Sequence, residues 1–260
     1  MAWIFPTESA PSTDLFISIP HRNSFSGRFI GSILTMRIPI PSHTFALETG
    51  QPIDISRNIS VSKALQMQAK YLLFIDSDVV VFPDSLEQLL LARRPFVSGL
   101  YRSRGAPHQI VANLGDKPVT DQMVNDNPLL AVDDVGMGFC LIDTRVLRNL
   151  ADTLKEFRCF INHKLQTGQE VTVYSAQEAA KNNYKCTICG NTVIARFFWS
   201  RQAMQNMLAL SEDYYFCHQV RKLGYQVLVC NKAWVGHESQ FVEIYKDGPV
   251  NPLQSAGLVK

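Results

Sequence analysis

Two aspartates stand one residue apart after five apolar residues, in the stretch YLLFIDSDVV at 71–80. We expect a parallel strand covered on both faces, because such strands are near-continuous apolar runs. Side chains two residues apart on a strand project to the same side, so Asp76 and Asp78 are expected together at its carboxyl end, where open α/β sheets bind ligands. Two neighbouring carboxylates need a positive partner, which a divalent cation with phosphate oxygens supplies. The pair therefore predicts a metal–diphosphate site.

The alternative interpretation is that both carboxylates only cap the loop and the helix that follows. Pro83, Asp84 and Glu87 do predict a helix start a few residues later. A bare Asp-x-Asp is common, but its position directly after five apolar residues favours the ligand site.

The segments before the aspartates alternate between strand and helix patterns, which predicts an open α/β sheet. A strand is expected at 15–19, followed by a helix opened by Ser24 or Ser26. The Pro-containing stretch 38–47 is expected to be irregular. A second helix is expected over 55–67, directly before the strand that carries the aspartates.

Composition limits the function classes. The chain has 260 residues, of which 46% are hydrophobic and 18% charged, enough for a full-sized core. The net charge is +2 and the basic residues are scattered, so we expect no nucleic-acid partner and no polybasic membrane anchor. The sequence begins without the features of a secretory signal and has no apolar run of about 18 residues, so we expect a cytoplasmic chain without a transmembrane segment.

A Glu-Asp pair opens a later helix pattern, SEDYYFCHQVRKLG. Ser211 can cap this helix and Gly224 can end it. Acidic residues favour the positive end of any helix, so Glu212 and Asp213 alone would not indicate chemistry.

Together these segments resemble the GT-A class of nucleotide-sugar glycosyltransferases, especially its large inverting family related to bacterial polysaccharide synthases. The resemblance implies a Rossmann-like, mostly parallel open sheet with helices on both faces, and it covers most of the chain except about 151–195. It rests on the order of seven features, ISIPHR at 17–22, ISRN at 55–58, LLFIDSDVVVFPDSL at 72–86, VSGLYRSR at 97–104, VDDVGMGFCLI at 132–142, SEDYYFCHQVRKLGYQV at 211–227, and His237.

The resemblance assigns roles on the donor side. Pro20 and His21 end the first strand, where these enzymes receive the nucleotide base, and Arg57 matches a basic position near the donor. By the same resemblance, Asp76 and Asp78 hold Mg²⁺ or Mn²⁺ against the donor diphosphate.

His237 resembles the late histidine that completes the metal or diphosphate site in this family. A single histidine carries little information, and an ordinary surface or core residue is the alternative.

On the acceptor side, the resemblance makes Asp213 the general base that takes the proton from the attacking hydroxyl. Core packing remains the alternative for the glycine-containing stretch and for the tryptophan among the further acceptor-site candidates, which are Gly136, Met137, Gly138, Trp199 and Glu212.

The segment 151–195 is expected to be an inserted subdomain. It contains a Cys-x₂-Cys-Gly knuckle and a Cys-x₃-His pair, which could complete a tetrahedral, structural zinc site with Cys159, His163, Cys186 and Cys189. A redox Cys-x-x-Cys pair and plain free thiols are the alternatives. The expected division of the chain is a nucleotide-sugar-binding part at 1–150, this insertion, and an acceptor and catalytic part at 196–260.

The predicted function is a metal-dependent, hexosyltransferase-like glycosyltransferase. It would move a sugar from a UDP- or GDP-linked donor to a hydroxyl of a glycan, lipid or protein, and the expected inversion rests on the Glu-Asp match alone. A phosphohydrolase of the haloacid dehalogenase type and a sugar nucleotidyltransferase are the alternatives. The former normally opens its fold with the Asp-x-Asp strand, and the latter needs a glycine-rich basic loop after the first strand.

Overall fold

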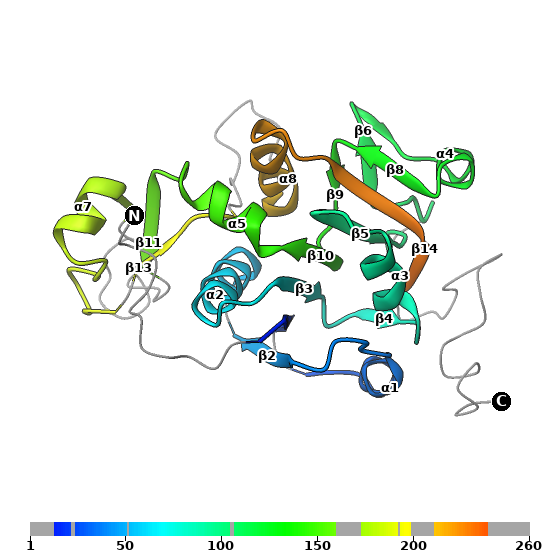
Figure 1. The fold of residues 1–260 in the computed structure, drawn as a ribbon, viewed down its shortest axis with the longest axis horizontal. Helices are drawn as coiled ribbons and strands as arrows, with labels where there is room; N and C mark the ends of the chain where they lie inside the picture. Colours follow the sequence, from blue (N-terminus) through cyan, green and yellow to red (C-terminus); the bar gives the residue numbers. More distant parts are fainter. Residues whose placement is uncertain are drawn as a thin grey trace.

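The computed structural model describes residues 13–21, 24–50, 52–104, 107–159, 173–191, 193–198 and 211–238. Its main feature is an eight-stranded sheet in which β1, β2, β3, β5 and β14 run in one direction and β4, β8 and β10 in the other (Figure 1). The order is β2-β1-β3-β10-β5-β14-β4, with β8 also paired to β14. These strands are β1 (Leu15–His21), β2 (His43–Thr49), β3 (Tyr71–Ile75), β4 (Val79–Val81), β5 (Phe96–Leu100), β8 (Leu129–Val132), β10 (Phe139–Asp143) and β14 (Val227–His237).

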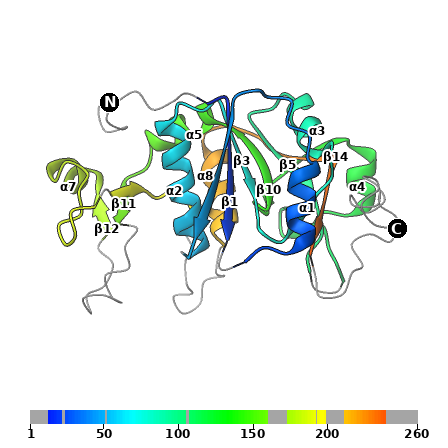
Figure 2. The same cartoon turned by 90° about the horizontal axis from the view of Figure 1, so that it is seen from below.

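Helices cover both faces of this sheet, as expected (Figure 2). Alternation along β3 divides its side chains, so that Leu72 and Phe74 enter one apolar core and Leu73 and Ile75 the other. The first core is completed by α2 (Ile53–Gln66), α5 (Thr144–Ala151) and α8 (Glu212–Lys222), and the second by α1 (Gly27–Thr35) and α3 (Ser85–Leu91).

Helix ends follow the sequence signals. The Ser26 hydroxyl accepts the Phe29 N–H and opens α1, and Ser211 accepts the Tyr214 N–H and opens α8. The residue after α8's C-cap, Gly224, has φ +84°, a left-handed conformation that favours glycine. The ends of α8, and with them the position of the Glu-Asp pair, were therefore predictable.

Two local expectations were wrong. The stretch 38–47 is not irregular throughout, since β2 pairs in parallel with β1 over its whole length; Pro39 and Pro41 precede the strand, where they remove no ladder hydrogen bond. The aspartates also do not continue the strand, because β3 ends at Ile75 and Asp76 to Asp78 form a turn before β4. Their side chains consequently face different partners.

Two smaller sheets lie outside the main one. The sheet β7-β6-β9 and helix α4 (Asp121–Asp126) adjoin β8 and β14, and the sheet β12-β11-β13 with α7 belongs to the expected insertion (Figure 1). The division of the chain at 150 and 195 stays a prediction. The strands are β6 (Ala112–Leu114), β7 (Lys117–Pro118), β9 (Asp134–Val135), β11 (Glu156–Cys159), β12 (Val173–Ser175) and β13 (Val193–Ala195).

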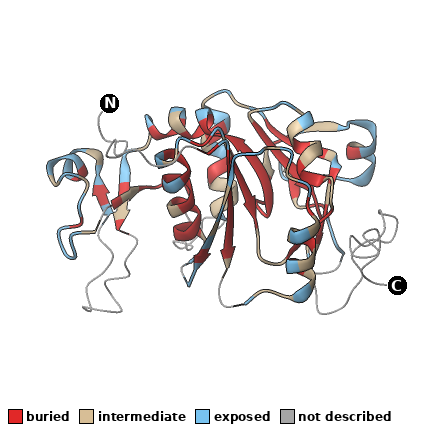
Figure 3. Ribbon diagram, turned by 60° about the horizontal axis from the view of Figure 1, so that its bottom comes forward, coloured by how far each residue is buried: buried red, intermediate tan, exposed pale blue. Residues whose placement is uncertain are grey.

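Burial separates the main sheet from the insertion (Figure 3). The strands of the central sheet are mostly buried, whereas most residues of α7 (Ala176–Lys181) and of the turn after it are exposed or half-buried. A capping box between Ser175 and Glu178 opens α7. Among the described residues, no helix is long and apolar enough to cross a membrane.

Candidate functional site

A buried arginine joins three carboxylates at the end of β3. Arg57, whose side chain is 1% exposed, donates from Nη2 to both oxygens of Asp76, at 3.0 and 3.1 Å. Its Nη1 donates to Glu212 Oε1 at 2.8 Å and also pairs with Asp213. The arginine thus connects α2, the turn after β3 and the N-terminus of α8, and it brings Asp76 and the Glu-Asp pair together. Their expected roles in one transfer site stay a prediction.

Burial and charge act in opposite directions on this arginine. Burial alone would lower the pKa of Arg57, but the Asp76 and Glu212 carboxylates outweigh it and raise the pKa. The guanidinium also lies 5.9 Å from the Phe74 ring centroid and 5.8 Å from that of Phe198. A cation held between aromatic rings and carboxylates stays charged, so its removal would leave three half-buried carboxylates facing one another.

The glycine-containing stretch before β10 contacts both acidic elements. The Met137 N–H donates to Asp213 Oδ2 at 3.2 Å, and the Gly138 carbonyl accepts the Asp76 N–H at 2.9 Å. A Cβ added at Gly136 would lie 2.2 Å from the Tyr101 hydroxyl. Close backbone approach therefore accounts for this glycine, and Asp213 and Asp76 are both fixed to one short loop.

The Tyr101 side chain contacts the glycine-containing loop before β10. Its hydroxyl, on a buried side chain, accepts the Gly138 N–H at 3.0 Å, and burial raises the pKa of the phenol well above its usual range. Its ring meets that of His237 edge-on with centroids 5.4 Å apart. Tyr101 therefore links the loop beside Asp213 to the histidine beside Asp78.

Asp78 faces a different pair of residues. One carboxylate oxygen pairs with Arg104, and the other, Oδ1, lies 3.6 Å from His237 Nε2. The Arg102 carbonyl can only accept, so His237 Nδ1, 2.9 Å away, donates to it. Burial lowers the pKa of His237 and outweighs that carbonyl, which raises it. In the neutral ring, Nε2 therefore carries a lone pair that points toward a carboxylate oxygen.

This geometry suits a divalent cation between Asp78 and His237. Two metal–ligand bonds of about 2.1 Å each can span the 3.6 Å between Oδ1 and Nε2. The Arg102 carbonyl fixes the tautomer, as the outer partners of metal-bound histidines commonly do. Asp76 is engaged by Arg57 instead, so in this arrangement the two aspartates and His237 do not form one three-ligand cluster.

The remaining donor and acceptor candidates are His21, Pro20 and Trp199. His21 ends β1, with Nε2 2.7 Å from Thr49 Oγ1 and its ring 4.3 Å from that of Phe25. Pro20 lies beside it and pairs in register with Glu48 of β2. Their expected role in receiving a nucleotide base stays a prediction, and Trp199 lies outside the described residues.

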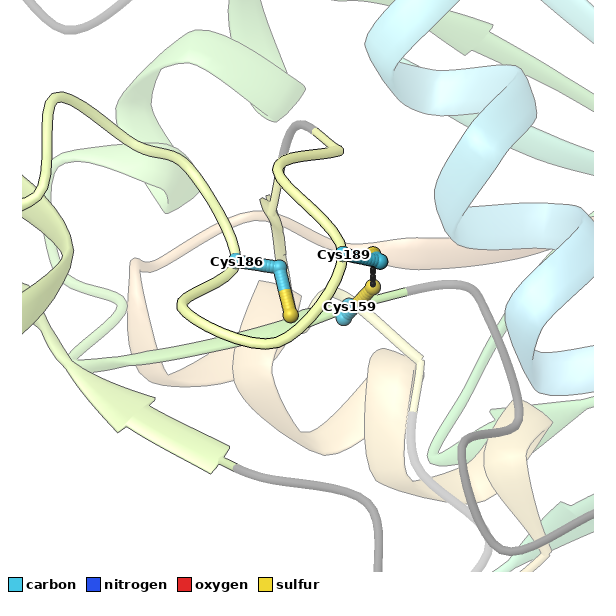
Figure 4. A group of neighbouring side chains, drawn as sticks. All are labelled: Cys159, Cys186 and Cys189. Carbon is cyan, nitrogen blue, oxygen red and sulfur yellow. Dashed lines mark hydrogen bonds between the residues drawn. The ribbon is translucent and has the colours of Figure 1, made fainter. Parts of the chain in front are cut away.

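Three of the four expected zinc ligands lie together in the insertion (Figure 4). The sulfurs of Cys159, Cys186 and Cys189 are all within 4.8 Å of one another, and those of Cys159 and Cys189 are 3.6 Å apart. These cysteines are the only group of three or more potential metal ligands that meets this distance in the described part of the chain. His163 lies outside it.

Hydrogen bonds favour the thiolate at this cluster. Burial raises the pKa of Cys186, but the Tyr174 hydroxyl and the backbone N–H groups of Cys189 and Ile188 outweigh it and lower the pKa to about 6. By contrast, burial raises the pKa of the Cys140 thiol in the main core to about 12. The cluster therefore has the chemistry of a metal site, whereas Cys140 is a core residue.

Sequence reasoning missed two residues that shape the site. The stretches VSGLYRSR and ISRN contain Tyr101 and Asn58, but these motifs assign no role to either residue. The Asn58 Oδ1 accepts the N–H groups of Phe197 and Phe198 at 2.8 and 3.0 Å. A polar Arg-Asn pair within a helix whose other side chains are mostly small or apolar was the available signal, because buried polar groups require partners.

This chain is similar to solved structures, but not to any family model or curated protein. The chain is similar to the crystal structure of A197 from STIV, with a TM-score of 0.50 and 15% identity, over 88% of this chain and 87% of that one. A crystal structure of GalNAc-T7 with UDP, GalNAc and Mn²⁺ gives a TM-score of 0.49 and 11% identity, over 90% of this chain but 44% of that chain. The likeness to A197 shows a shared fold alone, and the weaker one carries no argument about function.

Proposed function

We propose that the protein is a metal-dependent glycosyltransferase of the GT-A type that moves a sugar from a nucleoside-diphosphate donor to a hydroxyl acceptor with inversion. The observation that carries the proposal is the meeting of Asp76 and Asp213, far apart in sequence, on the buried Arg57 guanidinium. Asp78, which lies close to His237 of β14, belongs to the same turn after β3 as Asp76. A cation-and-diphosphate site beside a second carboxylate is the minimum that such a transfer needs.

On the donor side, Asp78 and His237 would hold Mn²⁺ or Mg²⁺. The ion, when bound, neutralises the charge that develops on the leaving nucleoside diphosphate. Arg104 pairs with Asp78, and its side chain is 57% exposed, so it can turn toward a diphosphate oxygen at small cost. We assign a UDP- or GDP-linked donor on the family resemblance, since no described contact selects the base.

On the acceptor side, Asp213 would act as the base. The acceptor oxygen forms a bond to the anomeric carbon, the bond from that carbon to the diphosphate breaks, and the hydroxyl proton passes to the Asp213 carboxylate. In the structure Arg57 pairs with Asp213, so the proposal requires this contact to loosen when both substrates are bound.

A dehalogenase-type phosphohydrolase is less well supported. That chemistry uses the first aspartate of Asp-x-Asp as a nucleophile, but both oxygens of Asp76 accept hydrogen bonds from Arg57. A carboxylate held in this way is poorly available for attack on phosphorus.

The test is a donor screen. Purified protein is incubated with UDP- and GDP-sugars and Mn²⁺ or Mg²⁺, and release of the nucleoside diphosphate and the configuration of the released or transferred sugar are followed by NMR. We expect metal-dependent turnover of one donor, lost by at least about a hundredfold in Asp213→Asn, in line with the usual contribution of a general base. Hydrolysis of a generic phosphate ester without turnover of any donor would contradict the proposal.

A further inference from the structure

We propose that Cys159, Cys186 and Cys189 bind a structural zinc ion, and that this ion holds β13 so that the residues after it lie against Arg57. The proposal concerns the insertion and stands whether or not the protein transfers sugars. It assigns to the insertion a role in shaping the site at the end of β3.

One pair of sulfurs has the spacing that a tetrahedral zinc ion requires, and the third sulfur lies close to both. With zinc–sulfur bonds of about 2.3 Å, neighbouring ligand sulfurs lie about 3.8 Å apart. The Cys159 and Cys189 sulfurs are 3.6 Å apart, and all three sulfurs lie within 4.8 Å of one another. Two of the cysteines come from one turn and the third from the end of β11, so an ion would join both (Figure 4).

The turn that carries Cys186 and Cys189 is shaped for this purpose. Gly190, in a left-handed conformation at φ +73°, donates its N–H to the Cys186 carbonyl at 2.9 Å and closes the turn. The Ile188 N–H and the Tyr174 hydroxyl both lie 3.4 Å from the Cys186 sulfur. Such donors to sulfur are the outer partners that stabilise metal-bound thiolates.

The described elements of the insertion are short. Its three strands contain only three or four residues each and α7 only six. Phe157, Tyr174 and Val193 are buried and join the first apolar core, but strands this short gain little stability from their own pairing. A metal ion is the usual stabiliser of such small units.

The exit from the insertion leads directly to the candidate active site. Asn58, next to Arg57 on α2, accepts the N–H groups of Phe197 and Phe198 and donates to the Phe198 carbonyl at 2.9 Å. The Phe198 ring stacks on Phe216 of α8 with centroids 4.3 Å apart and lies beside the Arg57 guanidinium. An ion that orders one end of β13 therefore restrains the aromatic ring beside Arg57.

The first experiment measures metal content in the full chain purified without added metal. We expect one zinc per chain by mass spectrometry of the metal, and cobalt substitution should give the sulfur-to-cobalt charge-transfer absorption of a thiolate site. Cys189→Ser, at an exposed position, should lose the ion; Cys230→Ala, in the main core, is the matched control and should keep it.

Two results would overturn the zinc site. One is a protein without zinc whose thiols all titrate as free; the other is a Cys159–Cys189 disulfide detected by mass. The positioning role has a separate readout in hydrogen exchange. Amides of 193–198 should exchange at least about tenfold faster in Cys189→Ser, while those of β3 stay protected. Zinc loss without faster exchange there would refute the positioning role alone.

Discussion

The two aspartates of the turn after β3 lie in contrasting surroundings. Both carboxylate oxygens of Asp76 accept hydrogen bonds from Arg57, whose side chain is 1% exposed. Asp78 instead pairs with Arg104, whose side chain is 57% exposed. We refer to Arg57, Asp76, Glu212 and Asp213 as the Arg57 cluster, and to Arg104, Asp78 and His237 as the Arg104 cluster. Under the proposed function, the Arg57 cluster would organise the site, and the Arg104 cluster, whose arginine is the more exposed, would exchange partners with a ligand.

The largest effect is expected from removing the buried cation. Arg57→Met should lower the free energy of unfolding by about 3–5 kcal/mol, because Asp76, Glu212 and Asp213 would face one another without a counter-charge. Urea denaturation measures the loss. Arg37→Met, which breaks the exposed Arg37–Glu87 pair, is the matched control and should cost less than about 1 kcal/mol.

Equal losses in these two variants would remove the distinction between a buried organising cation and an ordinary surface pair. A fully stable Arg57→Met would show that the three carboxylates take up protons or separate without cost.

A smaller loss is expected at the neighbour of Arg57. Asn58→Ala leaves the N–H groups of Phe197 and Phe198 without their acceptor, which should cost about 2–4 kcal/mol for the two donors. Thermal unfolding monitored by circular dichroism measures this. Asn58→Asp keeps an acceptor at that position and should recover part of the loss; no recovery would mean that the contact to the Phe198 carbonyl dominates.

Tyr101 stands between the two clusters and should show an intermediate effect. Tyr101→Phe removes the acceptor of the buried Gly138 N–H, with an expected loss of about 1–2 kcal/mol. Gly136→Ala should be more damaging in wild type than in Tyr101→Phe, because the added Cβ meets the hydroxyl at 2.2 Å. A double-mutant cycle by urea denaturation measures the coupling, and strict additivity would contradict the close contact.

The smallest stability change is expected in the Arg104 cluster. Arg104→Ala should alter the free energy of unfolding by less than about 1 kcal/mol, since the pair with Asp78 is solvent-exposed on the arginine side. Its effect should instead appear as weaker nucleoside-diphosphate binding in calorimetry. A loss of stability comparable with that of Arg57→Met would mean that both clusters are structural.

The sequence predicted those parts of the molecule that depend on local pattern. Nearby residues decide the strand at 71–75 and the Ser26 and Ser211 caps, and the structure contains all three. The pairing of β2 with β1 was missed because an edge strand beside prolines has a weak local signal.

The contacts of the site could not be predicted in the same way. Arg57 and Glu212 are 155 residues apart, and only the tertiary fold brings their side chains together, since α2 packs against β13 and Phe198 stacks on Phe216 of α8. The expected strand also predicted that the Asp76 and Asp78 side chains project in the same direction, because side chains two residues apart on a strand share a face. The turn after Ile75 separates them, and this turn creates the contrast between the two clusters.

We propose that the Arg104 cluster binds a nucleoside diphosphate together with a metal ion. Calorimetric titration of the protein with UDP and GDP, with and without Mn²⁺, measures this binding. We expect UDP or GDP to bind only when Mn²⁺ is present. Asp78→Asn should weaken this binding at least about tenfold, or by about 1.4 kcal/mol, and leave the unfolding temperature of the protein unchanged. Failure of both nucleotides to bind a folded protein with the ion, or equal binding to Asp78→Asn, would contradict it.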